Sequence, residues 1–288
     1  MEKYSVLMSV YYKEKAEYLR LAMNSMMEQT VPPDEFLLIC DGPLTEELDA
    51  VIDEFCEKYP NLMNVIRQKK NMGLGVTLNI GVQKCRNELI ARMDSDDIAV
   101  PERMETQLAV MEKYPEISVL GGQIAEFCDD PDQIIAYRKV PTEPADIRQF
   151  IKRRNPMNHM TVVLRKSHIL SVGNYQDVPG FEDYFLWSSL VAAGHELRNV
   201  KSVCCRVRAN AGLYTRRGGA RYFQNTMRVE RFLLEKKLIT LGEFRENVML
   251  RFAGSVLLPA QLRRTFFMKF LRKQDLESTD REFAATGK

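Results

Sequence analysis

The sequence predicts an α/β fold in which helices cover both faces of a mostly parallel sheet. Over about the first 100 residues, short apolar runs alternate with segments whose apolar residues recur at helical spacing. The apolar runs do not alternate strictly with polar residues, which is typical of parallel strands covered on both faces. One run ends directly in a cluster of aspartates, and ligands bind where the strands of such sheets end.

The predicted strands and helices of this region follow one another in strict alternation. The strands are Tyr4–Tyr12, Phe36–Cys40, Asn64–Arg67 and Leu89–Met93, and the helices between them are Glu17–Glu28, Thr45–Tyr59 and Gly73–Cys85. The first helix ends before Pro32, and the second begins at Thr45, a residue type that caps helices. Because each strand is followed by a crossover helix, the strands are expected to be parallel.

The later part of the chain has a different pattern. We expect one domain over residues 1–219, with a first half of about 1–115 and a second half of 116–219, followed by a mainly helical, basic extension over 220–288. The second half mixes helices with shorter strands. These strands are Ser118–Gly121, Ile134–Arg138 and Thr161–Leu164.

The net charge of +2 hides an uneven distribution of charge along the chain. Residues 200–288 contain 19 Lys and Arg against 8 Asp and Glu, a net +11, and residues 1–199 carry 22 against 31, a net −9. A basic tail favours an anionic partner such as a phosphate, a nucleic acid or a membrane surface. No nucleic-acid-reading motif accompanies it, so we expect no nucleic-acid partner.

Other features of the composition favour a cytoplasmic location. The first ten residues carry no basic segment followed by a long apolar one, so we expect no secretory signal. No window approaches 18 uninterrupted apolar residues. The six cysteines lack CxxC spacing, so we expect reduced, mostly buried thiols.

The stretch Leu89–Met104 (LIARMDSDDIAVPERM) carries the clearest chemical signal. A strand runs straight into Asp94, Ser95, Asp96 and Asp97, and Pro101 then suits the first turn of a helix. Clustered carboxylates repel one another unless a cation neutralises them, and hard oxygen ligands suit Mg²⁺ or Mn²⁺. The alternative is a solvated acidic turn in which Asp94 caps a helix.

Four segments, in this order, resemble the family 2 glycosyltransferases. They are SVYYKEKAEYLRLAMNSMMEQT, FLLICDGPLT, NMGLGVTLNIGV with LIARMDSDDIAVPER, and NHMTVVLRKS with GFEDYFLW, and the likeness covers roughly residues 1–215. The resemblance implies a Rossmann-like GT-A fold and inverting sugar transfer from a nucleotide-sugar. The PER segment after the acidic loop is most similar to bacterial exopolysaccharide and capsule transferases. The resemblance makes residues 1–115 the nucleotide-binding half and 116–219 the acceptor-side half.

The resemblance also implies which residues bind the donor. Asp41 is expected to accept a hydrogen bond from the base, Asp94 to bind the ribose side, and Asp96 to hold a metal that bridges the diphosphate. The remaining donor-site candidates are Ser9, Tyr11, Arg67, Asn71, Gly73 and Ser95, with Arg216 on a basic loop that folds over the diphosphate as a lid. The alternatives are that Gly73 only packs a helix and that the basic loop is simply solvated.

On the acceptor side, the resemblance assigns Asp183 as the base that takes the proton of the attacking hydroxyl. Glu182 is expected to position the acceptor or the base, and His159 and Trp187 to border the acceptor. Each assignment has a structural alternative. Acidic residues stabilise helix N-termini, a lone histidine is often structural, and Trp187 suits core packing as well as sugar stacking.

The segment Val248–Lys273 places Leu262, Phe266 and Phe270 on one side of a helix, with Arg264 and Lys269 mostly opposite. This pattern suits a helix that lies on an anionic membrane surface, where a lipid-linked acceptor would be met. The alternative is a helix that packs on the catalytic domain.

The sequence therefore predicts a metal-dependent inverting glycosyltransferase that acts on a saccharide or lipid-linked acceptor in bacterial surface polysaccharide biosynthesis. It is expected in the cytoplasm, with peripheral binding to the inner face of the membrane as an option. The rival interpretations are a sugar nucleotidyltransferase, which would need a glycine-rich loop after the first strand, a catalytically inactive nucleotide-sugar-binding module, and a two-carboxylate glycosidase.

Overall fold

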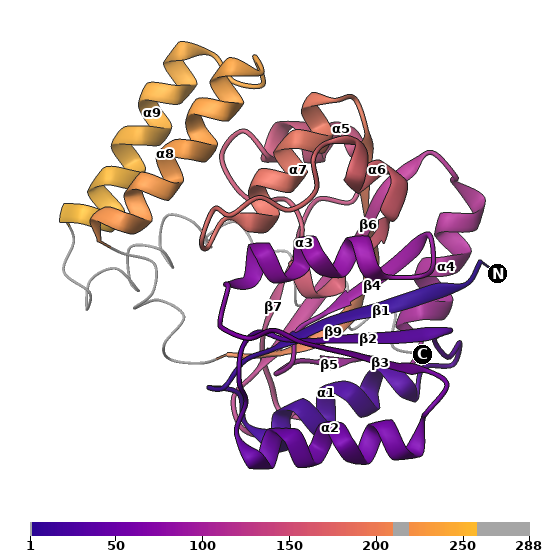
Figure 1. Cartoon of the computed structure of the whole chain (residues 1–288). Coiled ribbons are helices and arrows are strands. Elements are labelled where there is room, and N and C mark those ends of the chain that lie inside the picture. Colours follow the sequence, from indigo (N-terminus) through magenta and orange to yellow (C-terminus); the bar gives the residue numbers. More distant parts are fainter. Residues whose placement is uncertain (1, 210–218, 258–288) are drawn as a thin grey trace.

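A computed structural model describes residues 2–209 and 219–257 (Figure 1). Its centre is a nine-stranded sheet with the order β3-β2-β1-β4-β8-β6-β9-β5, and β7 pairs with β6 off this path. The strands are β1 (Tyr4–Val10), β2 (Glu35–Cys40), β3 (Met63–Arg67), β4 (Leu89–Met93), β5 (Ile98–Ala99), β6 (Ile117–Phe127), β7 (Ile134–Arg138), β8 (Val163–Arg165) and β9 (Glu196–Arg208). This is the α/β architecture that the sequence predicts.

The first four strands pair in parallel, as predicted. β1 pairs with β2 and β4, and β2 pairs with β3. The connecting helices are α1 (Ala16–Met27), α2 (Glu46–Lys58) and α3 (Leu74–Lys84). The Thr45 hydroxyl accepts the Leu48 N–H at 3.4 Å and caps α2 at the predicted start.

The second half of the sheet, for which the sequence predicts no strand direction, is mixed. β8 is antiparallel to β4 and β6, β7 is antiparallel to β6, and β9 is parallel to β6 but antiparallel to β5. β6 does not end at Gly121 but continues to Phe127, and β9 was not predicted. A Cβ atom at Gly122 would lie 2.2 Å from Cys204 Sγ, so this glycine lets β9 approach β6 closely.

Helices cover both faces of the sheet (Figure 1). On one face, α1, α2 and α4 (Arg103–Lys113) bury a core with alternate residues of β1 and β2. On the other face, α3, α6 (Lys166–Ser171) and α7 (Glu182–Ala192) bury a second core. Two short elements, α5 (Pro144–Phe150) and the 3-10 turn η1 (His159–Thr161), complete this side. The six cysteines are unpaired and four are buried, as expected.

After β9, the helices α8 (Ala220–Glu235) and α9 (Leu241–Phe252) form a hairpin that continues into a π-helical turn, η3 (Ala253–Leu257). The hairpin packs on α7. The Phe185 and Phe232 rings lie 4.6 Å apart between centroids, and the Phe181 and Tyr222 rings 4.9 Å apart. Within the part of the chain that the structure describes, no helix is long and apolar enough to cross a bilayer.

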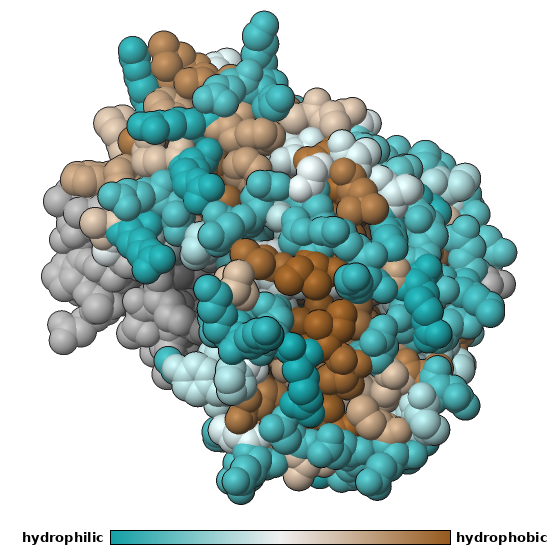
Figure 2. All heavy atoms as spheres, in the orientation of Figure 1, coloured by the Kyte–Doolittle hydropathy of each residue, from teal (hydrophilic) through white to brown (hydrophobic). Residues whose placement is uncertain are grey.

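Most of the surface in the view of Figure 2 is hydrophilic. A band of hydrophobic residues crosses it over α3 and the neighbouring edge of the sheet. Met72, before α3, is 40% exposed, and the edge strand β3 is mostly half-buried. The sheet is thus less completely covered at this edge than at its centre.

Candidate active site

The acidic loop, Asp94–Asp97, lies where β4 ends. Arg92, on β4, is only 2% exposed, and its guanidinium forms an ion pair with Asp94. The buried Arg103 of the PER segment donates from Nη2 to the Arg92 carbonyl oxygen at 2.9 Å, which ties α4 to the strand below the loop. The loop is therefore anchored from beneath by two buried arginines.

Glu14 is a fourth carboxylate at this loop, and the sequence analysis missed it. The Ser95 hydroxyl donates to Glu14 Oε2 at 2.7 Å. Burial, the charge of Asp94 and the charge of Glu14 raise the pKa of Asp96 to about 7. Glu14 lies four residues beyond β1, which ends at the same edge of the sheet as β4, and this position is the signal that would have revealed it.

The other end of the acidic loop is fixed to β9. Asp97, which is 2% exposed, accepts the Arg208 backbone N–H at 3.0 Å, a contact that orients the loop. No helix starts at Asp94, because the next helix, α4, begins at Arg103. The alternative that Asp94 caps a helix is therefore wrong, and Pro101 precedes the helix instead of lying in its first turn.

The donor set of the acidic loop suits a hard divalent cation. It consists of carboxylate oxygens, and burial together with the charges of Asp94 and Glu14 holds the pKa of Asp96 far above its usual range. Across residues 2–209 and 219–257, no three carboxylate, imidazole or thiolate groups converge on one point. A cation bound at Asp96 and Asp94 would thus need further ligands, and Mg²⁺ and Mn²⁺ readily take these from substrate phosphates and water.

Asp41, after β2, anchors the loop that precedes α3. Its two carboxylate oxygens accept the N–H groups of Met72 at 2.6 Å and Gly73 at 3.1 Å, and Asn71 Nδ2 donates to its carbonyl oxygen at 3.1 Å. Gly73 has φ +86°, a conformation that favours glycine. The structure brings Asp41, Asn71 and Gly73 together, as the family resemblance implies, although Asp41 already holds two backbone donors.

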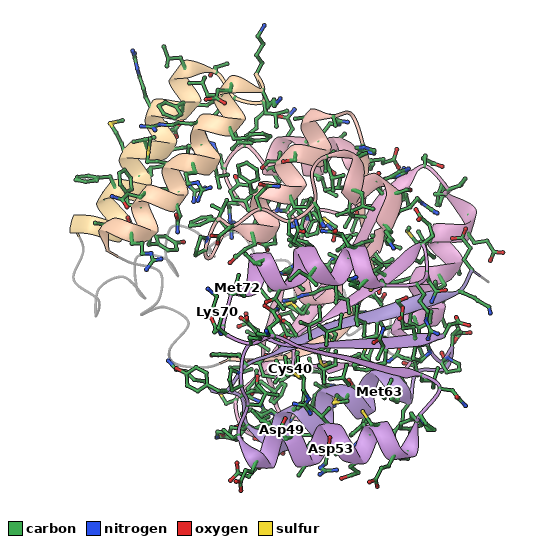
Figure 3. The ribbon with its side chains drawn as sticks, viewed as in Figure 1. Cys40, Asp49, Asp53, Met63, Lys70 and Met72 are labelled. Atoms are coloured by element: carbon green, nitrogen blue, oxygen red, sulfur yellow. The ribbon has the colours of Figure 1, made fainter. Side chains whose placement is uncertain are left out.

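Arg67 pairs with Cys40 across the sheet, but its side chain is bound to α2. Its guanidinium forms ion pairs with Asp49 and Asp53 of α2, the second at 3.7 Å. Figure 3 shows Asp49 and Asp53 on α2, whereas Lys70 and Met72 lie near the start of α3. Two acidic partners, which the sequence analysis did not consider, therefore compete with any nucleotide for Arg67.

The remaining donor-side candidates lie near the end of β1. Ser9 is half-buried in the strand, and Tyr11, just beyond it, is 37% exposed. Both are close to the edge from which the acidic loop projects, because Met8 pairs with Met93. Arg216 lies outside the residues that the structure describes.

Asp183 lies in the first turn of α7, with both carboxylate oxygens hydrogen-bonded. Asn155 Nδ2 donates to Oδ2 at 2.5 Å, and the Tyr184 N–H donates to Oδ1 at 2.7 Å. Burial raises the pKa of Asp183, while Asn155, the Tyr184 N–H and the charges of Arg92 and Arg138 oppose that rise. The half-buried carboxylate is thus held in one orientation, and Asn155 is a positioning residue that the sequence analysis missed.

Glu182 lies between α7 and α3. It is 8% exposed, and burial raises its pKa. A Cβ atom at Gly75 would lie 3.0 Å from Glu182 Cγ and 2.7 Å from the Gln176 carbonyl oxygen. The glycine therefore allows the start of α3 to approach Gln176 and the start of α7, which carries Glu182 and Asp183.

His159 and Trp187 meet on the acceptor side, but only His159 is partly exposed. His159 Nε2 lies 2.8 Å from the Tyr175 hydroxyl, and burial lowers the pKa of the imidazole, so the ring is neutral. Trp187 is 0% exposed and its ring centroid is 6.0 Å from that of His159. The assignment of Trp187 as a sugar-stacking residue is wrong for this structure, because a fully buried indole has no free face. It packs in the core, the alternative that the sequence left open.

Arg92 joins the two sides of the site. Its charge lowers the pKa of Asp183 and of the Tyr175 phenol, and its guanidinium pairs with Asp94. Among the residues that the structure describes, its Nε and Nη1 atoms have no hydrogen-bond acceptor although both are buried. The buried Arg92 guanidinium thus acts electrostatically on both the acidic loop and the start of α7.

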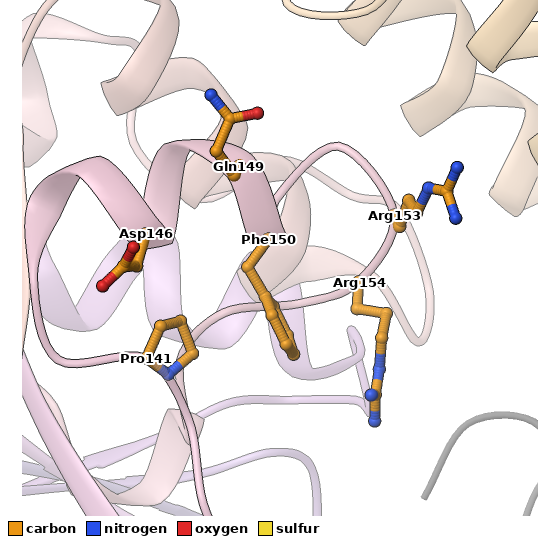
Figure 4. Close-up of a pocket in the computed structure, with 6 residues that line it drawn as sticks. All are labelled: Pro141, Asp146, Gln149, Phe150, Arg153 and Arg154. Carbon is orange, nitrogen blue, oxygen red and sulfur yellow. The ribbon is translucent and has the colours of Figure 1, made fainter. Parts of the chain in front are cut away.

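A shallow hollow of about 330 Å³ lies behind this region, beside α5 (Figure 4). It is lined by Pro141, Asp146, Gln149, Phe150, Arg153 and Arg154. The hollow holds none of the site residues predicted from sequence. Its end at Arg154 adjoins Asn155, the partner of Asp183.

Comparison with known proteins decides the family. Residues 5–170, which contain β1 to β8 and the acidic loop, match the family described as Glycosyl transferase family 2. The chain belongs to glycosyl transferase family 2. It is accordingly a glycosyltransferase, and the matched region includes Asp94–Asp97.

Relatives of known name extend the match beyond the family region. The amylovoran biosynthesis glycosyltransferase AmsE of Erwinia amylovora is 38% identical over 234 residues, which cover 81% of this chain and 86% of AmsE. A UDP-Gal:alpha-D-GlcNAc-diphosphoundecaprenol beta-1,3-galactosyltransferase of Escherichia coli is 34% identical over 271 residues, which cover 94% of this chain and 97% of that enzyme.

Solved structures agree with the predicted fold. Residues 1–349 of S. aureus TarS, in complex with UDP-GlcNAc, superimpose with a TM-score of 0.65 at 16% identity, over 92% of this chain and 75% of the TarS chain. At this identity the likeness concerns the fold alone, and it confirms the GT-A type architecture.

Proposed function

We propose that this glycosyltransferase transfers a hexose, with inversion and with the help of a divalent metal, from a UDP-sugar to a hydroxyl of a saccharide carried on a lipid diphosphate. The reaction would serve the biosynthesis of a bacterial surface polysaccharide. The relatives support the acceptor and the process, because one is named for amylovoran biosynthesis and another for a diphosphoundecaprenol acceptor. The UDP-sugar is supported by that second name and by the ligand of the TarS complex.

The proposal is carried by two groups of carboxylates that both interact with Arg92. One is the acidic loop, and the other is Asp183 at the start of α7. Asp183 has both oxygens oriented by hydrogen bonds, which suits a base. The acidic loop carries crowded carboxylates, which suit a cation-assisted diphosphate site. Asp96 follows β4 and Asp183 lies at the start of α7, so an acceptor and a donor would meet between these two segments.

In the proposed reaction, the acceptor hydroxyl oxygen attacks the anomeric carbon of the donor while Asp183 takes the hydroxyl proton. The new carbon–oxygen bond forms as the bond from the anomeric carbon to the diphosphate breaks, and the electron pair leaves with the nucleoside diphosphate. Asp96, with Asp94, would hold the divalent cation, which supplies positive charge beside the diphosphate. A single displacement inverts the anomeric configuration.

We also propose that the enzyme works at the inner face of the cell membrane. A diphospholipid acceptor lies at that surface, and the basic C-terminal region suits anionic lipids. On α9, Leu241, Met249 and Leu250 are each more than half exposed. The amphipathic segment Leu262–Lys273 that supports this proposal in sequence lies outside the described residues.

A transfer assay tests the proposed function. The purified full chain is incubated with UDP-galactose, UDP-glucose or UDP-N-acetylglucosamine, and with an α-linked N-acetylglucosamine diphosphate that carries a short lipid, in Mn²⁺, Mg²⁺ or EDTA. We expect a disaccharide product with one UDP-sugar, a β-linkage by NMR from the α-configured donor, and no product in EDTA. A parallel thermal-shift screen compares UDP, GDP and dTDP on the wild type and on Asp96→Ala.

Each result has a definite meaning. A product with an α-linkage would overturn the inverting mechanism, and full activity in EDTA would overturn the metal. Stabilisation by GDP or dTDP in place of UDP would overturn the donor class. Binding of UDP-sugar without turnover on any saccharide acceptor would favour the inactive binding module over the enzyme proposed here.

A further inference from the structure

The segment before Asn155 has three successive backbone carbonyl groups that are held by side chains. The Tyr184 hydroxyl donates to the Ile151 carbonyl oxygen at 2.6 Å. Asn247 Nδ2 donates to that of Lys152 at 2.8 Å, and Arg251 Nη2 donates to that of Arg153 at 2.8 Å. The last two donors come from α9, almost 100 residues further along the chain.

Two ion pairs between the same helix and residues 152–153 add to these hydrogen bonds. Lys152 Nζ lies 3.7 Å from Glu243 Oε1, and Arg153 Nη2 lies 3.1 Å from Glu246 Oε2. Figure 4 shows the Arg153 side chain pointing from the 151–154 turn toward the hairpin. The contacts on α9 recur at spacings of three, four and eight residues from Glu243, so they form one face of the helix.

A buried carboxylate on α8 orients the two donors. Glu230 is 0% exposed and lies 2.9 Å from Arg251 Nε and 2.9 Å from Asn247 Nδ2. Asn247 Nδ2 thus donates to the Glu230 carboxylate and to the Lys152 carbonyl oxygen. Arg251 likewise pairs with Glu230 and donates to the Arg153 carbonyl oxygen. Burying an ion pair costs desolvation, and such a pair specifies geometry better than it adds stability.

We propose that the α8–α9 hairpin is a positioning element for the catalytic base, in which Glu230, Asn247 and Arg251 hold residues 151–155 so that Asn155 donates to Asp183. The inference rests on the proposed role of Asp183 as the base. The chain of contacts is continuous: Glu230 orients Arg251 and Asn247, these fix the carbonyl groups of Arg153 and Lys152, and Asn155 follows two residues later. Tyr184, next to Asp183, closes the loop through Ile151.

The expected consequence concerns the protonation of Asp183. Its carboxylate faces Asn155, the Tyr184 N–H, Arg92 on β4, Arg138 on β7 and the neighbouring Glu182. Loss of the Asn155 hydrogen bond removes a donor that favours the ionised form, so the base would protonate at higher pH. Substitutions in the hairpin would therefore change the pH profile of turnover without touching the substrate.

The test compares Arg251→Met with Arg245→Met in the full-length enzyme. Arg245 lies on the same helix, is exposed, and makes no hydrogen bond or ion pair with residues 151–155 among those described. Its substitution by Met therefore removes the same charge from α9 but keeps the contacts with residues 151–155. We expect Arg251→Met to lower kcat about tenfold and to move the acid limb of the kcat–pH profile upward. The KM for the UDP-sugar should stay within twofold, and Arg245→Met should match the wild type in all three measurements.

Two further variants separate positioning from folding. Glu230→Gln combined with Arg251→Met removes the buried ion pair and the Arg251 hydrogen bond to Arg153 without leaving a buried charge unpaired, and Arg251→Lys keeps a cation beside Glu230. We expect the double variant to retain its circular dichroism spectrum while its acid limb stays displaced, and Arg251→Lys to recover part of kcat. Hydrogen exchange should be faster in residues 151–155 of the double variant than in the wild type.

The outcomes distinguish this inference from the proposed function. If the wild type transfers sugar, Asp183→Asn does not, and the folded double variant has the wild-type kcat and pH profile, the positioning role is refuted while the function stands. If Asp183→Asn keeps full activity, the role of the base is refuted first. A displaced acid limb in the double variant but not in Arg245→Met supports the inference.

Discussion

The acidic loop and the start of α7, which carries Asp183, both hold carboxylates that interact with Arg92, but the two segments are built in opposite ways. At the acidic loop, Asp94, Asp96 and Glu14 crowd one another, and burial raises the pKa of Asp96 to about 7. At the start of α7, Asn155 and the Tyr184 N–H donate to the two oxygens of Asp183, and α9 holds the backbone of residues 152–153 just before Asn155.

The difference shows which side of the site is complete in the protein alone. Crowded carboxylates repel one another, so the proposed donor side would be completed only by a bound cation. The Asp183 side is preorganised, as a base must be to accept a proton without reorientation.

Asp183→Asn should have the largest effect, because an amide cannot take the proton of the acceptor hydroxyl. We expect kcat to fall about 10³-fold, in the range of general-base catalysis, with donor binding by calorimetry unchanged. Glu182→Gln serves as the comparison and should retain more activity. Equal losses in the two variants would mean that the structure does not distinguish the base.

Asp96→Asn should lower transfer about 10²-fold and abolish the metal-dependent thermal shift with UDP. The metal-free variant should nevertheless melt at a higher temperature than the wild type. Because the folded pKa of Asp96 is raised, its stabilising protonated form is lost as the pH rises through about 7, so the difference in Tm should be larger at pH 8.5 than at pH 5.5. An equal or lower Tm at both pH values would contradict the crowding.

Asn155→Ala should act through the pH dependence of kcat. Burial already raises the pKa of Asp183 above the usual value for aspartate, about 3.9, and loss of the Asn155 donor should raise it further. We expect kcat to fall about tenfold near neutral pH, with an acid limb shifted upward by about one pH unit. An unshifted limb would show that Asn155 does not act on the base.

Trp187→Phe should have the smallest effect on catalysis. The indole is 0% exposed and packs against His159, so the substitution should lower the free energy of unfolding by about 2 kcal/mol in chemical denaturation. The acceptor KM should stay within twofold. A large rise in acceptor KM with unchanged stability would instead support a sugar-stacking role for Trp187.

The candidate site was predictable from sequence where one segment carries the signal. The acidic loop follows a buried strand, and the two acidic residues of GFEDYF start a helix, so both could be located without a structure. Glu14 and Asn155 were not predicted, because each acquires its role through a partner 81 or 28 residues away. Trp187 is a residue type that often stacks on sugars, and only its burial in the tertiary structure shows that it packs in the core.

The parallel half of the sheet, the position of the acidic loop and the family could be predicted from sequence, because apolar periodicity, helix-capping residues and motif order are local properties of the chain. The mixed half of the sheet, the burial of Trp187 and the contacts of α9 with residues 151–155 could not. These depend on contacts between segments far apart in sequence. On α9, the polar residues Glu246, Asn247 and Arg251 contact residues 152–153, which lie almost 100 residues earlier in the chain.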